Sequence, residues 1–210
     1  QPKEMRGGRR TLLAGSCTQP IQHQQAIIVD DLAFLKNETN KPVKMTLPGP
    51  MTVVDSTNNN FYSSEEEMAF AWANAINKEA KLLDDLGVDI IQFDEPAFSR
   101  YPDKVEKWGI EALDQCVSGL KCSTAVHVCY GYPQPGLLRP VNDSYETIIA
   151  LLEQSKVDQL ALEFEGANLD PKLLKNCPSK TVIFGCVFNS DEVMEKPHSV
   201  AKRLCEAAEF

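Results

Sequence analysis

Apolar positions along the chain fall into two alternating patterns. Continuous apolar runs of strand length occupy residues 43–47, 88–93, 123–129, 159–164 and 181–187. Between and after these runs, apolar residues recur at helical spacing over 63–86, 104–120, 144–154, 171–174 and 200–210. Because strands that alternate with helices form parallel sheets through right-handed crossovers, the pattern predicts an α/β fold with about five to six strand–helix units.

The first long helix has clear boundary signals. Ser64 is followed three residues later by Glu67, which is the spacing of a capping box, and acidic residues fill the first turn. Gly87 follows the last apolar position, where a glycine commonly ends a helix. These signals predict a helix that begins after Ser64 and ends before Gly87.

Two architectures fit this order of elements: a doubly wound open sheet and a (β/α)8 barrel of the TIM type. No Gly-rich phosphate-binding loop follows a predicted strand, so a dinucleotide-binding open sheet has no support. Five or six strands cannot close an eight-stranded barrel, and a barrel would therefore be incomplete in this chain. Residues 1–210 are expected to form a single domain, with a poorly defined N-terminal segment at 1–41.

The composition excludes several classes of protein. The 210 residues are 43% hydrophobic and 24% charged, with a net charge of −9. Dispersed acidic charge argues against a nucleic-acid partner, which requires a basic face. No apolar run is long enough to cross a membrane, and from the polar start of the chain we expect no signal peptide. Seven cysteines, an odd number without a compact framework, favour reduced thiols and a cytoplasmic location.

Chemically versatile residues gather at the carboxyl ends of the predicted strands, where parallel α/β folds bind their substrates. Asp94 and Glu95 follow one strand, His127 and Cys129 end the next, and Glu163 ends the one after. Because His127 and Cys129 are two residues apart on a strand, they point to the same face. Sheet geometry places all five on one edge, within reach of a metal ion or a small ligand.

His127, Cys129 and Glu163 together offer nitrogen, sulfur and oxygen donors, which suit Zn²⁺. A thiol that entered an open position on the metal would lose its proton and become a nucleophile. Two simpler interpretations stay open at this point. His127 and Cys129 could be packed in the core, and Asp94-Glu95-Pro96 could be a turn that caps the following helix.

The chain resembles the catalytic barrel of the cobalamin-independent methionine synthase family. The resemblance covers roughly residues 42–190 and depends on stretches that come in the family's order: Lys44–Thr52, Asp89–Ala97, Trp108–Ala112, His127–Tyr130 and Leu162–Glu163. It favours the barrel over the open sheet.

The resemblance implies a methyltransferase of methionine biosynthesis, in which Zn²⁺ binds the homocysteine thiolate and a methylfolate donates the methyl group. His127, Cys129 and Glu163 resemble three of the family's zinc ligands. Asp94 resembles the acid that holds the amino group of homocysteine, and Glu95 beside it is included in the expected substrate-binding site.

The chain also departs from the family's pattern. The fourth zinc ligand, a cysteine in a motif like Asn-Cys-Gly, has no counterpart, and neither Cys186 nor Cys205 replaces it. The family's first strands are missing upstream of residue 42. We therefore expect either a part of a longer protein or a truncated relative that takes its missing strands from another chain, as an oligomer would.

The half of the site that serves the methyl donor is less well matched. No aromatic residue follows the Gly-Pro-x-Thr motif until Phe61, and the family's histidine is absent from 188–191. The donor therefore stays open between a 5-methyltetrahydrofolate type and another compound. Two alternatives to the homocysteine reaction also stay open. One is a non-catalytic or other-thiol relative with an incomplete site, and the other is an enzyme like uroporphyrinogen decarboxylase, for which the strand ends offer only Arg100 and Arg139.

Overall fold

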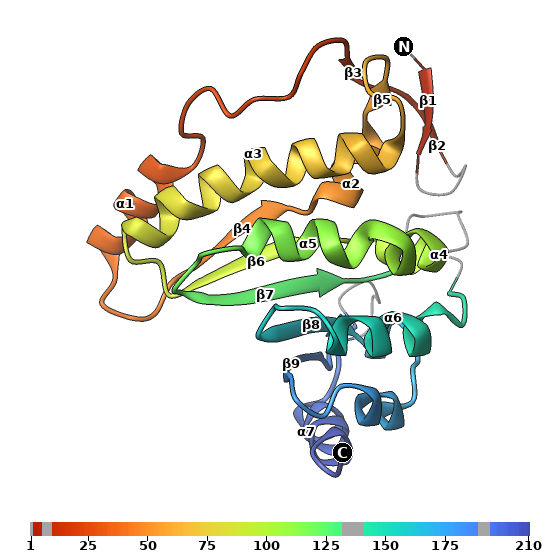
Figure 1. Ribbon diagram of the computed structural model, residues 1–210. Helices are drawn as coiled ribbons and strands as arrows, with labels where there is room; N and C mark the ends of the chain where they lie inside the picture. The colour runs from red at the N-terminus through yellow and green to blue at the C-terminus, as the bar shows by residue number, and fades with distance from the viewer. Residues whose placement is uncertain (1, 6–9, 132–140, 189–193) are drawn as a thin grey trace.

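The computed structural model describes residues 2–5, 10–131, 141–188 and 194–210. Its centre is a parallel five-stranded sheet (Figure 1). The strands are β4 (Lys44–Pro48), β6 (Ile90–Asp94), β7 (Ser123–Val128), β8 (Gln159–Glu163) and β9 (Thr181–Gly185). Their spatial order is their order along the chain. Each crossover therefore steps in the same direction, as in a barrel, whereas the strand order of a doubly wound sheet reverses.

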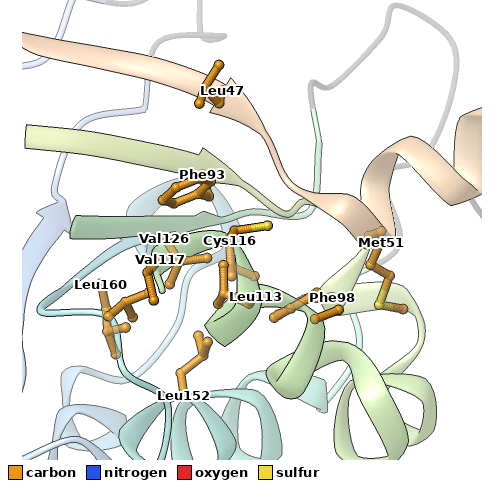
Figure 2. Packing of buried hydrophobic residues seen from close by; sticks show 14 of the residues in the cluster. Leu47, Met51, Phe93, Phe98, Leu113, Cys116, Val117, Val126, Leu152 and Leu160 are labelled. Carbon is orange, nitrogen blue, oxygen red and sulfur yellow. The ribbon is translucent and has the colours of Figure 1, made fainter. Parts of the chain in front are cut away.

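Helices cover one face of this sheet. They are α3 (Glu65–Asp85), α5 (Ile110–Val117) and α6 (Ser144–Glu153). Figure 2 shows the buried side chains where these layers meet: Phe93, Val126 and Leu160 from the strands, with Leu113, Val117 and Leu152 from α5 and α6. This contact removes a large apolar area from water and is the main source of the domain's stability.

The opposite face of the sheet is more polar and more exposed. Because side chains alternate along a strand, the neighbours of the core residues point to this second face. The strand register aligns one residue from each strand there in a row: Thr46, Gln92, Ala125, Gln159 and Thr181. In a closed barrel this face lines the interior.

Shorter elements connect the strands. After β4 comes α2 (Pro50–Ser56), a helix that the sequence pattern did not predict. Between β6 and β7 the chain forms a 3₁₀ turn (Phe98–Arg100), α4 (Pro102–Lys104) and a π-helical turn (Val105–Gly109) that leads into α5. After β8 come 3₁₀ turns at Glu165–Ala167 and Pro171–Asn176, and α7 (Pro197–Ala207) follows β9.

The N-terminal segment contains short regular elements. β1 (Pro2–Met5) and β2 (Arg10–Leu13) form an antiparallel hairpin. β3 (Ser16–Cys17) pairs with β5 (Asn58–Asn59), and α1 spans Val29–Glu38. In Figure 1 the chain between β3 and α1 runs along α3. Within the described ranges, no helix is both long enough and apolar enough to cross a membrane.

Candidate functional site

The carboxyl ends of β6, β7 and β8 bring the predicted site residues to one edge of the sheet. Asp94 on β6 is paired in register with His127 on β7. The last pair of the next ladder is Val128 with Leu162, so Cys129 and Glu163 follow directly beyond it. By alternation, Asp94, His127, Cys129 and Glu163 all belong to the face of the sheet that is turned away from the helices.

Cys129 lies half-buried among carboxylates. Burial raises the pKa of its thiol, and the nearby charges of Glu163 and Asp94 raise it further. The backbone N–H of Gly131 donates a hydrogen bond to Sγ of Cys129 over 3.3 Å, and this hydrogen bond lowers the pKa of the thiol. A sulfur in these surroundings is stabilised as a thiolate only when a cation is close to it.

Glu163 is held by the backbone of the neighbouring strand end. Its Oε2 accepts a hydrogen bond from the N–H of Tyr130 over 2.9 Å. The hydroxyl of Tyr145 donates to the carbonyl of Val128 over 2.6 Å and accepts from the N–H of Glu163 over 3.2 Å. Tyr145 also stacks on Tyr130, with 4.9 Å between ring centroids. These contacts fix the end of β8 against the end of β7.

Asp94 and Glu95 are adjacent in sequence and lie in different environments. The side-chain amide of Gln92 donates to Oδ1 of Asp94 over 2.8 Å on the open face of the sheet. Glu95 has no exposed surface, and its carboxylate is turned toward the start of α2. The structure therefore places Asp94 on the open face of the sheet and Glu95 behind it, where its buried carboxylate contacts the start of α2 and not the open face on which the substrate contact was predicted.

Three hydrogen bonds hold the Glu95 carboxylate. Oε1 accepts from the N–H of Met51 over 2.9 Å, while Oε2 accepts from the N–H and the hydroxyl of Thr52 over 2.8 and 2.7 Å. Burial raises the pKa of Glu95 to about 7, and the hydrogen bonds from Thr52 and Met51 act in the opposite direction. The turn at Asp94-Glu95-Pro96 thus does cap a helix, but this helix is α2, which precedes the turn.

The backbone around Glu95 joins three strand ends. The N–H of Glu95 donates to the carbonyl of His127 over 2.8 Å, and the N–H of Gly49 donates to the carbonyl of Asp94 over the same distance. Gly49 packs so closely that a Cβ there would lie 2.2 Å from Cδ of Glu95. The positions of Asp94 and His127 relative to each other therefore depend on this cluster.

The donor types at this edge fit Zn²⁺, although the ligands are not assembled. Imidazole, thiolate and carboxylate are the groups that zinc binds in proteins. His127 and Cys129 are both partly exposed, which weighs against the simple packing interpretation. Among the described residues, however, no three His, Cys, Asp or Glu side chains are grouped closely enough to hold a metal ion.

The supporting residues of the site were missed from the sequence. Ser99 donates from its hydroxyl to the carbonyl of Cys129 over 2.8 Å, and Ser144 donates to the carbonyl of Ser99 over 2.8 Å. Tyr145 was predicted only as part of the apolar face of a helix. Gln92 could have been found, since it lies two residues before Asp94 on the same face of the same strand.

The parallel sheet is wound in one direction, which defines an α/β protein of the barrel class. Its acidic, imidazole and thiol groups lie at the carboxyl ends of the strands, where the active sites of barrel enzymes are found. The particular family follows from a match over nearly the whole chain. Residues 3–209 match the family described as "Cobalamin-independent synthase, Catalytic domain". The chain belongs to the cobalamin-independent methionine synthase family, as the resemblance implied.

Individual relatives agree with this assignment. The chain is 32% identical over 192 residues to a methionine synthase of Thermococcus kodakarensis, and 30% identical over 190 residues to one of Sulfurisphaera tokodaii. Each alignment covers 90% of this chain, but only 53% and 52% of the relative. The chain thus spans about half the length of these curated relatives.

Solved structures confirm the fold. A B12-independent methionine synthase from Shewanella sp. W3-18-1, in complex with selenomethionine, is similar with a TM-score of 0.92 and 35% identity. The similarity covers 100% of this chain and 63% of that one. A methyltransferase from Methanosarcina mazei, at 14% identity and a TM-score of 0.66, shares the fold. The predicted barrel type, incomplete in this chain, is confirmed.

Proposed function

We propose that the protein transfers a methyl group to the thiol of homocysteine and so forms methionine. The observation that carries the proposal is the convergence of Asp94, His127, Cys129 and Glu163 at the carboxyl ends of three adjacent strands, in a chain of this family. The relative from Shewanella contains selenomethionine, an analogue of the proposed product. The chain covers only part of its relatives, and the proposal concerns the full-length protein.

Asp94 provides the anchor for the amino acid substrate in this proposal. Its carboxylate lies on the open face of the sheet, paired in register with His127. An ammonium group bound there would gain a charge-assisted hydrogen bond, which is about twice as strong as a neutral one. Homocysteine held by its amino group at Asp94 would direct its thiol along the sheet edge toward His127 and Cys129.

We further propose that His127, Cys129 and Glu163 bind Zn²⁺. Their donor types fit the metal, and the two carboxylates near the Cys129 sulfur provide the negative potential that a cation requires. When bound, zinc supplies a Lewis acid that lowers the pKa of a coordinated thiol. The backbone N–H of Tyr130 keeps one oxygen of Glu163 oriented along the strand end.

The methyl donor is proposed as a 5-methyltetrahydrofolate type or another methyl compound. A non-catalytic relative with an incomplete site is the second candidate, and the lack of a three-ligand cluster within the described ranges favours it. The decarboxylase alternative required free arginines. Arg100 is paired with Asp55 over 3.0 Å, Arg139 lies outside the described residues, and the family match points to the synthase.

The test measures methionine formed from homocysteine by the full-length protein, with a 5-methyltetrahydrofolate and with alternative donors. Asp94→Asn removes the charge that would hold the substrate ammonium, so the KM for homocysteine should rise at least about tenfold. Asp103→Asn, at an exposed position of α4, is the matched control and should leave KM unchanged. If no donor yields methionine, or if both variants behave alike, the proposal is wrong.

A further inference from the structure

We propose that Gln92 is a positioning residue that fixes the Asp94 carboxylate for the amino group of the substrate, and that Lys44 sets the orientation of the Gln92 amide. This inference rests on the proposed function. It concerns a chain of hydrogen bonds on the open face of the sheet, outside the predicted set of site residues.

This series of hydrogen bonds runs from Lys44 on β4 to Asp94 at the end of β6. Nζ of Lys44 donates to Oε1 of Gln92 over 2.6 Å, and Nε2 of Gln92 donates to Oδ1 of Asp94 over 2.8 Å. Gln92 and Asp94 are two residues apart on one strand, so their side chains leave the sheet on the same face. β4 and β6 are neighbours, with Thr46 paired to Gln92, which places Lys44 alongside.

The ammonium of Lys44, the amide of Gln92 and the carboxylate of Asp94 permit only one donor-to-acceptor direction for this series of hydrogen bonds. An ammonium can only donate hydrogen bonds, and a carboxylate can only accept them. The amide of Gln92 therefore satisfies both neighbours only with its oxygen toward Lys44 and its nitrogen toward Asp94. The flipped amide would bring two donors together at Lys44 and two acceptors together at Asp94. Lys44 thus selects the amide orientation that holds Asp94.

The consequence concerns the binding of an ammonium. Gln92 engages Oδ1 of Asp94, and in the described part of the chain no second hydrogen bond to this carboxylate occurs. The carboxylate is therefore restrained through one oxygen, and the other oxygen is left for a ligand. A carboxylate that is already oriented loses less side-chain entropy on binding.

The same row of the sheet offers a comparison residue. Gln159 on β8 occupies the row of Gln92, two strands away. No hydrogen bond of its side chain occurs among the described residues. Both glutamines point away from the helices and the apolar core, so replacement of either should leave the packing of the core unchanged. An effect on the substrate specific to Gln92 would therefore come from its contact with Asp94.

The experiment compares Gln92→Leu with Gln159→Leu in the full-length protein. For Gln92→Leu we expect the KM for homocysteine to rise about tenfold, the effect of one hydrogen bond to a charged group. The kcat, the KM for the methyl donor and the thermal midpoint should stay near wild-type values. Gln159→Leu should resemble wild type in all four. Gln92→Glu keeps the shape but cannot donate when ionised, and it should raise the KM for homocysteine further.

A double-mutant cycle tests the part assigned to Lys44. Lys44→Met should raise the KM for homocysteine by a smaller factor, about threefold, because the amide then loses its preferred orientation. In the Gln92→Leu background the same change should have no effect. Additive effects would show that Lys44 acts independently of Gln92.

The outcomes separate this inference from the proposed function. An active wild type in which Gln92→Leu and Gln159→Leu have the same KM for homocysteine would overturn the inference alone. A Gln92→Leu variant that loses stability and affinity for both substrates equally would also overturn it. A wild-type protein that forms no methionine would overturn the proposed function, and the inference with it.

Discussion

Glu95 is the residue whose surroundings most constrain the site. It is a carboxylate without exposed surface, and all three groups that donate to it belong to the start of α2. An unpaired buried carboxylate would be very costly, so its hydrogen-bond partners must stay in place whenever the protein is folded. Glu95 therefore stabilises the loop that precedes α2 and, through its backbone, the end of β7.

Gly49→Ala tests how tightly this cluster is packed. The added Cβ would lie 2.2 Å from Cδ of Glu95, and the buried carboxylate could move away only by giving up its hydrogen bonds to Met51 and Thr52. We expect a loss of about 1–3 kcal/mol in the free energy of unfolding, the usual cost of overpacking. Gly15→Ala is the control, because nothing lies within 4 Å of its Cβ position. Equal stability of the two variants in denaturant unfolding would contradict the packing described for Glu95.

For single residues, the sequence predicts which side chains have the chemistry of a functional site, but it does not predict the direction in which each side chain points. Asp94 and Glu95 were placed together in the substrate site. Alternation along an extended chain sends neighbouring side chains to opposite faces, so only one of the two can join His127. The partners of Glu95 could not be found in this way, since α2 was itself not predicted.

The ends of α3 show how local sequence signals become structure. Ser64 is the N-cap, and its hydroxyl oxygen accepts from the N–H of Glu67 over 3.0 Å, as the capping-box spacing predicts. The Glu67 carboxylate, however, accepts from the N–H of Ser63 over 2.9 Å, one residue earlier than in the standard box. Gly87 follows the helix with a φ of 75°, which suits a glycine.

Ser64→Ala should remove the cap and lower the free energy of unfolding by about 1 kcal/mol, because the N–H of Glu67 loses its partner. Ser64→Gly should lower the free energy of unfolding by only about a few tenths of a kcal/mol, since the backbone N–H groups then become accessible to water. Urea unfolding of both variants is the measurement. If the two replacements are equally destabilising, the hydroxyl of Ser64 does not act as a cap.

A second contact of α3 makes stability dependent on pH. Glu79 is 2% exposed and accepts from His23 over 2.6 Å and from the N–H groups of Ile27 and Ile28 over 2.8 and 2.9 Å. Burial raises the pKa of Glu79. The hydrogen bonds lower it, with the largest contribution from His23, and they outweigh the effect of burial, so the pKa of Glu79 lies below its ordinary value. This carboxylate ties the segment before α1 to α3.

The sign of the pH effect follows from the lowered pKa. The unfolded chain binds a proton at Glu79 more readily than the folded chain does, so the stabilisation is present above the ordinary value of 4.5 and is lost as the pH falls below it. Glu79→Gln should therefore be less stable than wild type at neutral pH, and the difference in thermal midpoint should shrink in acid. A difference that is constant with pH would contradict this role.

Elements were predicted well where a single period dominated. The five strands of the main sheet and the helices α3, α5 and α6 follow from their patterns. α2 was missed because Pro48-Gly49-Pro50 was interpreted only as a stop, although Pro50 occupies the first turn of a helix. The pairings of β1 with β2 and of β3 with β5 depend on contacts distant in sequence, which periodicity does not reveal.

For the whole molecule, the decisive feature is the order of the strands. The alternation of strands and helices allowed both an open sheet and a barrel, and only the winding distinguishes the two. All four pairs of neighbouring strands in the main sheet are parallel, so every carboxyl end lies on one edge. The pairs are also consecutive strands of the β/α repeat, so successive strand ends are neighbours on that edge. The distribution of Asp94, His127, Cys129 and Glu163 over successive strand ends therefore places all four on the same edge of the sheet, although in the described part of the chain they are not grouped closely enough to hold a metal ion.

Binding of Zn²⁺ by His127, Cys129 and Glu163 is tested by the zinc content of the purified full-length protein. It is measured for wild type, Cys129→Ser and Cys205→Ser. We expect about one zinc per chain in wild type, because imidazole, thiolate and carboxylate at the ends of β7 and β8 complement the metal. Cys129→Ser should lose that zinc, whereas Cys205→Ser, an exposed position on α7, should keep it. A folded wild type without zinc, or a Cys129→Ser variant that keeps its zinc, would show that these residues do not form a zinc site.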